Sequence, residues 1–140
     1  MATGTYKVDL SKIWLFSGCS TKELNSIRQN LEAEVAKPGK VFCQEGEVGR
    51  ECFLIVNGKA SVKRNNRKVA TLEAGDIFGE LSLLDQSLRS ATVTAETDVE
   101  VLILGQRQFN GLLDSVPSLS RKVLATLATR LREADAKAYH

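Results

Sequence analysis

The chain has 140 residues, a length typical of one domain that can bury a hydrophobic core. Hydrophobic residues make up 43% and charged residues 26%, which is ordinary globular composition. The 19 Lys and Arg against 17 Asp and Glu give a net charge of +2, too balanced to indicate nucleic-acid or membrane-surface binding. No apolar run approaches a membrane span and the N-terminus lacks a hydrophobic signal core, so we expect a cytoplasmic protein without membrane insertion.

Cysteine and histidine usage argues against an enzyme or a metal protein. Cys19, Cys43 and Cys52 are widely spaced without a Cys-x-x-Cys pair, as expected for reduced structural thiols. The one histidine is the terminal His140, whereas a catalytic triad needs an internal imidazole and metal-dependent barrel enzymes use two or three. We therefore expect no catalytic residue, no metal and no catalytic cofactor.

The N-terminal part of the chain, residues 9–31, has a helical pattern. Leu10, Ile13 and Trp14 follow helical spacing. Ser20 and Glu23 have the spacing of a capping box, in which two residues of the first helical turn satisfy each other's backbone N–H groups. A helix is therefore predicted to begin just after Ser20.

Residues 32–104 have the pattern of an antiparallel β-structure. Short β-branched and aliphatic segments alternate with turn signals such as Asn57-Gly58 and Gly75-Asp76, roughly every eight to ten residues. The segment 61–72 predicts a hairpin with Asn65-Asn66 at its tip, because asparagine tolerates left-handed backbone. Solubility explains the basic residues beside this tip, at positions 63, 64, 67 and 68.

A helical pattern returns after Gly105. Pro117 divides residues 106–136 into a short and a longer helix. The longer helix carries an apolar stripe at three-four spacing, formed by Leu124, Leu127, Leu131, Ala134 and Ala138. Because the stripe ends in alanines, it does not favour a stable coiled coil. Three alternatives stay open: the helix folds back over a ligand, it contacts an effector domain or partner protein, or it forms a weak homodimer.

These patterns together predict one domain spanning residues 1–140. Its fold class is mainly β with flanking helices: an antiparallel β-roll, of the jelly-roll or double-stranded β-helix kind, between N-terminal helices and a C-terminal helix pair.

Glu80 and Arg89 stand out in the mostly small and apolar stretch FGELSLLDQSLRSATVTA, residues 78–95. Glu80 opens the segment 80–85, which breaks strand alternation and predicts a single helical turn. The free N–H groups at the start of that turn suit a small anion, and Arg89 adds a planar fork of donors suited to phosphate. Since Glu80 can accept a hydrogen bond from a sugar hydroxyl, the pair fits a compact ligand that carries both a phosphate and a hydroxyl.

At these residues the sequence resembles the cyclic nucleotide-binding domain family. The family's phosphate-binding cassette runs Phe-Gly-Glu-Leu-Ala-Leu, a short loop, and Arg-(Ala, Ser or Thr)-Ala-Thr-Val, and residues 78–83 and 89–93 follow it here. The resemblance, which extends from about residue 10 onward, implies that Glu80 binds the ribose 2′-hydroxyl and Arg89 the cyclic phosphate. The other candidate ligand-binding residues are Gly79, Leu81, Ser82, Ser90, Val69 and Arg130.

Two features depart from the family pattern. Many members have Gly and Pro in the loop before the arginine, where this chain has Gln86 and Leu88, so the loop is expected to differ in shape or preorganisation. Members also cap the base with a residue of the last helix. The capping pair of some members falls at Ala134-Asp135, whereas Arg130, one turn earlier, resembles the capping arginine of the channel members.

The resemblance implies a regulatory module that binds a cyclic mononucleotide and moves its C-terminal helices. We expect cAMP to be favoured and cGMP to be tolerated, because the Ser90 hydroxyl can reach the exocyclic amine of a syn guanine. The alternative is a degenerate member that binds no nucleotide and serves as an interaction or dimerisation unit. Direct nucleic-acid binding is not expected, because no second helical pair follows to supply a recognition helix.

Overall fold

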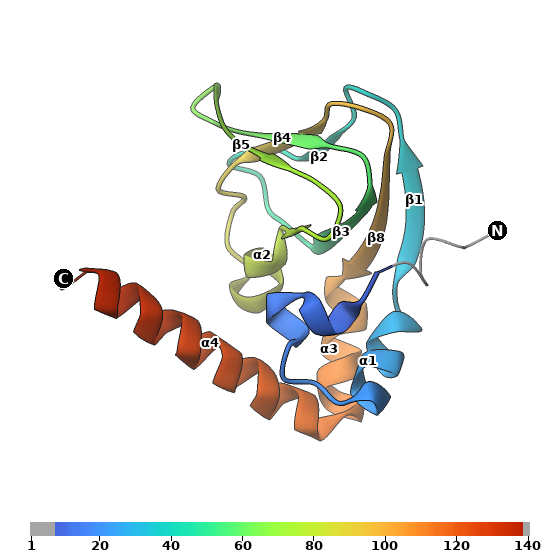
Figure 1. The fold of residues 1–140 in the computed structure, drawn as a ribbon, viewed down its shortest axis with the longest axis vertical. Helices are drawn as coiled ribbons and strands as arrows, with labels where there is room; N and C mark the ends of the chain where they lie inside the picture. Colours follow the sequence, from blue (N-terminus) through green and yellow to red (C-terminus); the bar gives the residue numbers. More distant parts are fainter. Residues whose placement is uncertain (1–7, 139–140) are drawn as a thin grey trace.

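The computed structural model describes residues 8–138, and the terminal His140 lies outside the described part (Figure 1). The helical elements are η2 (Leu10–Lys12), η3 (Trp14–Phe16), α1 (Thr21–Arg28), α2 (Glu80–Asp85), α3 (Gln106–Ser115) and α4 (Pro117–Ala138). The strands are β1 (Glu32–Ala36), β2 (Val41–Cys43), β3 (Glu51–Asn57), β4 (Ala60–Arg64), β5 (Arg67–Leu72), β6 (Ile77–Phe78), β7 (Thr92–Ala95) and β8 (Val99–Gly105).

The strands form two four-stranded sheets. One has the order β1-β8-β3-β6 and the other β2-β7-β4-β5, with antiparallel pairing throughout. In Figure 1 the second sheet lies above, while η2, η3, α1, α3 and α4 lie below the first. The predicted fold class, mainly antiparallel β with flanking helices, is confirmed, and the sheets do not close into a barrel.

Strands β3 and β8 are buried on both faces, and they separate two hydrophobic cores. Side chains of successive residues in a strand point to opposite faces. Phe53 and Val101 therefore lie in the core between the sheets, whereas Leu54 and Leu102 lie in the core under the helices. Burial on both faces explains why these strands read as nearly continuous apolar runs instead of alternating ones.

The N-terminal segment is less regular than its helical pattern predicted. Two 3-10 turns, η2 and η3, precede α1, and the Asp9 carboxylate caps the first of them by accepting from the Ser11 N–H at 3.0 Å. The predicted capping box is confirmed, because Ser20 N donates to Glu23 Oε1 at 2.6 Å and Glu23 N donates to Ser20 Oγ at 3.2 Å. This box fixes α1 at the residue that the sequence predicts.

The hairpin and the short helix form where the sequence predicts them. Asn65 and Asn66, at the β4–β5 tip, have φ values of 52° and 64°, in the left-handed region. Helix α2 begins after Gly79 and ends at Gln86, which adopts a left-handed φ of 56°. The loop thus takes a backbone conformation that a glycine would favour, although the residue is glutamine, at a cost of roughly 1–2 kcal/mol.

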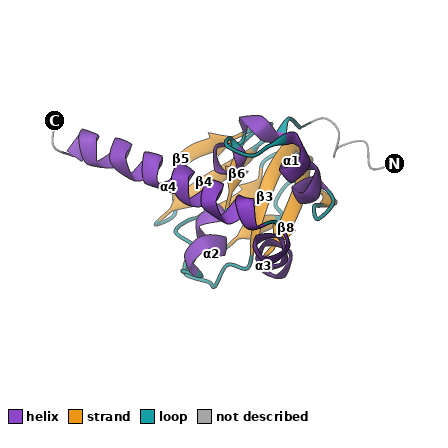
Figure 2. Cartoon of the chain, turned by 90° about the horizontal axis from the view of Figure 1, so that it is seen from below, coloured by secondary structure: helices purple, strands orange, loops and turns teal. Residues whose placement is uncertain are grey.

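Helix α4 has two different halves. Its first turns pack on the helical core through the buried Leu119 and Val123, whereas all side chains at positions 128–137 are exposed. Figures 1 and 2 show this second half projecting away from the body of the domain. Across residues 8–138, the helices are all too short or too polar to cross a membrane.

Candidate ligand-binding site

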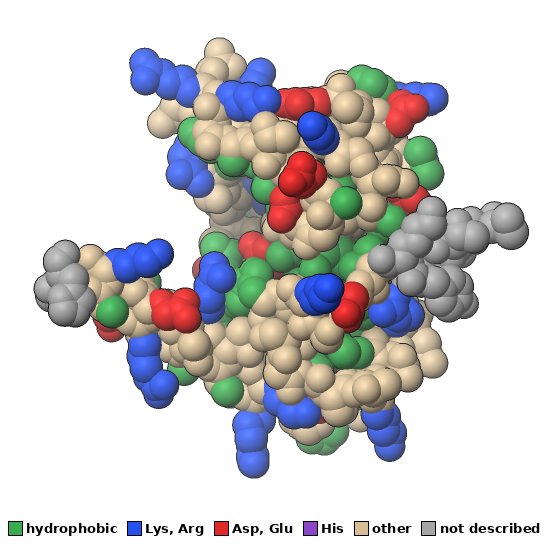
Figure 3. Space-filling model, viewed as in Figure 1, with side chains coloured by type: hydrophobic (Ala, Val, Ile, Leu, Met, Phe, Trp, Pro, Cys, Tyr) green, Lys and Arg blue, Asp and Glu red, His purple; other side chains and the backbone are tan. Residues whose placement is uncertain are grey.

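A cavity of about 340 Å³ lies between the β4–β5 hairpin and α2, which is the size of a small-molecule site. Figure 3 shows the surface hollowed between the hairpin and α4, with Lys and Arg side chains gathered over the hairpin above. The predicted residues that line the cavity are Gly79, Glu80, Leu81, Ser82, Arg89, Ser90 and Val69. Arg130 does not line it.

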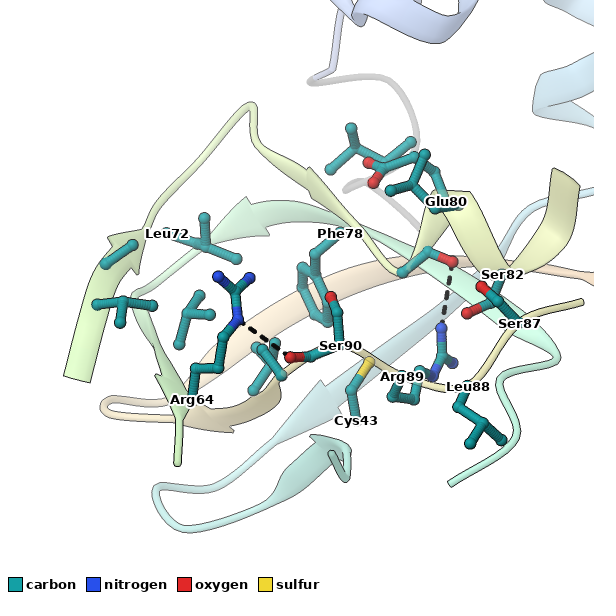
Figure 4. Close-up of a pocket in the computed structure, with 18 residues that line it drawn as sticks. Cys43, Arg64, Leu72, Phe78, Glu80, Ser82, Ser87, Leu88, Arg89 and Ser90 are labelled. Atoms are coloured by element: carbon teal, nitrogen blue, oxygen red, sulfur yellow. Dashed lines mark hydrogen bonds between the residues drawn. The ribbon is translucent and has the colours of Figure 1, made fainter. Parts of the chain in front are cut away.

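Arg89 is held at the inner wall of this cavity by main-chain groups. Its backbone N–H donates to Glu47 O at 2.7 Å and its carbonyl accepts from Gly46 N at 2.9 Å. Its guanidinium donates from Nη1 to Gly79 O at 3.1 Å and from Nη2 to Glu51 O at 2.8 Å (Figure 4). The main-chain carbonyl groups of Gly79 and Glu51 therefore hold the Arg89 side chain in place.

Two glycines make room for the Arg89 guanidinium. A Cβ at Gly49 would lie 2.5 Å from Cζ of Arg89, and one at Gly79 would lie 2.6 Å from its Nη1. Gly79 also has a φ of +78°, a conformation that L side chains rarely adopt. Any larger residue at either position would displace the guanidinium.

Arg89 is a buried cation that forms no ion pair with a carboxylate among the residues that the structure describes. It is only 8% exposed, and its acceptors are carbonyl oxygens, while the ion pairs found among residues 8–138 do not join it to Glu80. A buried charge is costly unless an opposite charge or a full set of hydrogen bonds compensates it. The cavity beside Arg89 is therefore suited to an anion that the protein does not supply.

Glu80 points away from Arg89 (Figure 4), and the groups that act on its carboxyl include the Trp14 side chain of η3 and Arg130 of α4. Burial raises the pKa of its carboxyl above the usual range, and this shift is opposed by its own backbone N–H, by a hydrogen bond from the Trp14 side chain and by the charge of Arg130. Glu80 and Arg89 do not form an ion pair in this geometry. Instead, Glu80 connects the cavity to η3 and α4.

Arg130 stacks on Trp14. Its guanidinium carbon lies 4.5 Å from the centre of the indole ring, a typical cation–π geometry. The structure thus places Arg130 outside the cavity but within electrostatic reach of Glu80. Its predicted role in capping the base stays a prediction.

Apart from Arg64, the other walls of the cavity are apolar or neutral. Val69, Leu81 and Leu88 line it although each is more than half exposed, so they offer hydrophobic surface to a ligand. Burial raises the pKa of the Cys43 thiol to about 11, against the effect of Arg89, and the thiol stays protonated near neutral pH. Groups of three or more His, Cys, Asp or Glu placed to hold a metal ion are absent from residues 8–138.

Sequence reasoning missed three contributors to this site. Gly49 and the carbonyl of Glu51 hold Arg89, but they come from a turn and a strand end that carry no motif of their own. Arg64, attributed to solubility, lines the cavity and donates from Nε to Ser90 O at 3.1 Å. Strand alternation could have identified Arg64, because it lies two residues after Val62 and shares its face.

Comparison with known proteins agrees with the fold and the site. Residues 33–116 match the cyclic nucleotide-binding domain family, and the chain belongs to this family. The resemblance that the cassette predicts is thereby confirmed.

Two individual relatives have names that refer to cyclic AMP. The Cyclic AMP receptor protein of Thermus thermophilus is 33% identical over 126 residues, covering 86% of this chain and 58% of that protein. The cAMP-dependent protein kinase regulatory subunit of Hypocrea atroviridis is 34% identical over 117 residues, covering 84% of this chain and 25% of that protein. The chain therefore spans only part of these relatives.

A solved structure has nearly the same extent. The N-terminal domain of a transcriptional regulator from Streptomyces coelicolor A3(2) superposes with a TM-score of 0.85 at 26% identity. The match covers 91% of this chain and 96% of that one. The whole described fold is thus that of a domain already known in a regulator.

Proposed function

We propose that this chain is a regulatory module that binds a cyclic mononucleotide and catalyses no reaction. The observation that carries the proposal is the buried Arg89 guanidinium, which lies beside a cavity of ligand size and has no ion pair with an acidic side chain within residues 8–138. A cyclic phosphate supplies a single negative charge and oxygen acceptors for such a fork. Family membership supports the same ligand class.

Among cyclic nucleotides, we propose cAMP as the first candidate and cGMP as the second. The names of two relatives refer to cyclic AMP. The apolar side chains of Val62, Val69 and Leu72 line the cavity and offer a surface for a purine ring. Glu80 supplies an acceptor for the ribose 2′-hydroxyl at the start of α2.

The proposed signal leaves through α4. The first half of this helix is anchored, because Glu23 of α1 accepts from Ser118 Oγ and from Lys122 Nζ. The exposed second half is in contact with η3 near its start, through the Arg130–Trp14 stack. A ligand that binds to the Glu80 carboxyl changes the interactions of this carboxyl with Trp14 and Arg130. Ligand binding therefore shifts the position of residues 128–137 and not that of the whole helix.

The alternative function, an interaction unit that needs no nucleotide, is favoured by one observation. Leu124 and Leu131 of α4 are each 66% exposed and lie two helical turns apart. They would bury this surface against a partner helix or a second copy of the chain. This surface and the cavity are separate, so a partner and a ligand can both be accommodated.

Isothermal titration of the full chain separates the two functions. We expect cAMP to bind with a stoichiometry of one and cGMP to bind more weakly. Linear 5′-AMP carries a second phosphate charge and lacks the cyclic phosphodiester ring, so we expect it to bind much more weakly than either. Absence of heat with both cyclic nucleotides, in a protein shown to be folded by circular dichroism, would favour the interaction unit.

A further inference from the structure

Arg64 occupies the end of the cavity opposite Arg89. Figure 4 shows its side chain on the side of Leu72, while Arg89 lies beyond Ser90 on the other side. The hydrogen bond from Arg64 Nε to Ser90 O, at 3.1 Å, links the last residue of β4 to the phosphate-binding cassette. An arginine tied in this way has a defined position although its side chain is exposed to solvent.

The two terminal nitrogens of Arg64 have no acceptor among the described hydrogen bonds and ion pairs of residues 8–138. A guanidinium carries five N–H donors in a rigid plane, and Nε accounts for one of them. The cavity therefore has two separate forks of donors. Arg89 lies beside the main chain of Gly79, and Arg64 lies among the apolar residues Val62 and Leu72.

The surroundings of the two forks suit different parts of a nucleotide. The polar end, with Arg89 and the start of α2, suits the phosphate and the sugar, which leaves the base at the apolar end beside Arg64. The edge of a 6-oxopurine presents two acceptors, O6 and N7, and an arginine can donate one N–H group to each of them. Adenine presents N7 beside an amino group, which is itself a donor and cannot accept from the guanidinium.

We infer that Arg64 is a specificity-determining residue that contacts the purine base and favours a carbonyl over an amino group at position 6. The inference rests on the proposed function and deepens it, since it assigns the residue that lets a cAMP-type pocket accept cGMP. Ser90 cannot account for such a preference by itself, because its hydroxyl would contact the 2-amino group, at a different edge of the base.

Titration of variants with three ligands tests this inference. The probes are cAMP, cGMP and cyclic inosine monophosphate, which has the 6-carbonyl of guanine but lacks the 2-amino group that Ser90 would contact. The test variant is Arg64→Met, which keeps most of the apolar stem and removes every donor. The matched control is Arg67→Met, because Arg67 pairs with Arg64 across the hairpin, is exposed and does not line the cavity.

We expect Arg64→Met to lower the affinity for cGMP and cyclic inosine monophosphate by about tenfold, and the affinity for cAMP by no more than about threefold. Arg67→Met, with the same loss of charge, should change all three by a similar small factor. Arg64→Lys, which keeps the charge without the fork, should lose most of the 6-oxopurine effect. Thermal unfolding of Arg64→Met should match the wild type, because its side chain is exposed.

The other outcomes overturn the inference in distinguishable ways. An equal loss of affinity for all three ligands would show that Arg64 contacts the phosphate. Unchanged affinity for all three would show that Arg64 does not contact the ligand. A loss confined to cGMP, with cyclic inosine monophosphate unaffected, assigns the preference to the 2-amino group. If the wild type binds none of the three, the proposed function fails and the inference fails with it.

Discussion

The Glu80 carboxyl has two possible sets of partners, and they are on opposite sides of it. In the structure it faces Trp14 and Arg130, and burial raises its pKa. A ribose hydroxyl in the cavity would add a donor from the other side and favour the ionised form. Ligand binding at this residue is therefore expected to be linked to its protonation.

Substitution Glu80→Gln tests both roles of this residue. If the carboxylate accepts the 2′-hydroxyl, the wild type should bind 2′-deoxy-cAMP more weakly than cAMP by about 1–3 kcal/mol, and the variant should reduce that difference. Equal affinity of the wild type for both nucleotides in calorimetry would reassign Glu80 to capping α2.

The same variant should stabilise the ligand-free protein at neutral pH. Because folding raises the pKa of Glu80, its ionised form is disfavoured in the folded state, and stability is lost as the pH rises through that pKa. Thermal unfolding should thus show a higher melting temperature for Glu80→Gln at neutral pH and a smaller difference in acid. A variant that is less stable at neutral pH would show that Trp14 and Arg130 more than compensate for burial.

At the scale of the elements, Glu23 joins α1 to α4. It is only 5% exposed and accepts from Lys122, from Ser118 and from the backbone of Ser20, which together lower its pKa to about 2. Hydrogen bonds to a charged group contribute more than neutral ones, although the partly exposed Lys122 is screened by solvent. This residue anchors the first half of α4 while the second half stays exposed.

Glu23→Gln should lower the free energy of unfolding by about 1–2 kcal/mol at neutral pH. Folding lowers this pKa, so the stabilisation is present above the ordinary value of 4.5 and disappears as the pH falls toward about 2. Urea unfolding at several pH values should show the two proteins converging in acid. The control Glu34→Gln, at an exposed position of β1, should have no comparable effect, and a pH-independent difference would contradict the ionic origin.

Movement of α4 can be followed through Trp14, the one tryptophan of the chain. If ligand binding draws residues 128–137 toward the cavity mouth, Arg130 leaves the indole ring and the emission of Trp14 changes. Amide exchange should slow in residues 128–137 and stay unchanged in residues 118–127, which are already anchored. Arg130→Leu should alter the emission of the ligand-free protein, and identical exchange with and without nucleotide would make α4 a fixed scaffold.

At the scale of the whole molecule, the sequence predicts the elements whose patterns are local. The capping box at Ser20, the Asn65-Asn66 hairpin tip and the helical turn at 80–85 depend on neighbours in the chain, and the structure has all three. The two 3-10 turns replace part of the predicted N-terminal helix, because packing on the helical core decides such a short segment.

The candidate site is predictable only where it is a continuous motif. Glu80 and Arg89 belong to one cassette and line one cavity, and their roles toward a ligand stay predictions. The support for Arg89 from Gly49 and Glu51, and the position of Arg130 on Trp14, arise between segments far apart in the sequence. No local pattern encodes those contacts, so they could not be derived before the fold was known.

The central claim is that the buried Arg89 guanidinium binds the cyclic phosphate, and calorimetric titration of Arg89→Leu with cAMP tests it most directly. The account predicts a loss of affinity of about a hundredfold or more relative to the wild type, since the phosphate loses its charge-assisted donors. Arg67→Leu serves as the charge-matched control, and circular dichroism checks that the variant folds although Gly79 O and Glu51 O lose their donor. A folded Arg89→Leu that binds cAMP as tightly as the wild type would contradict the account.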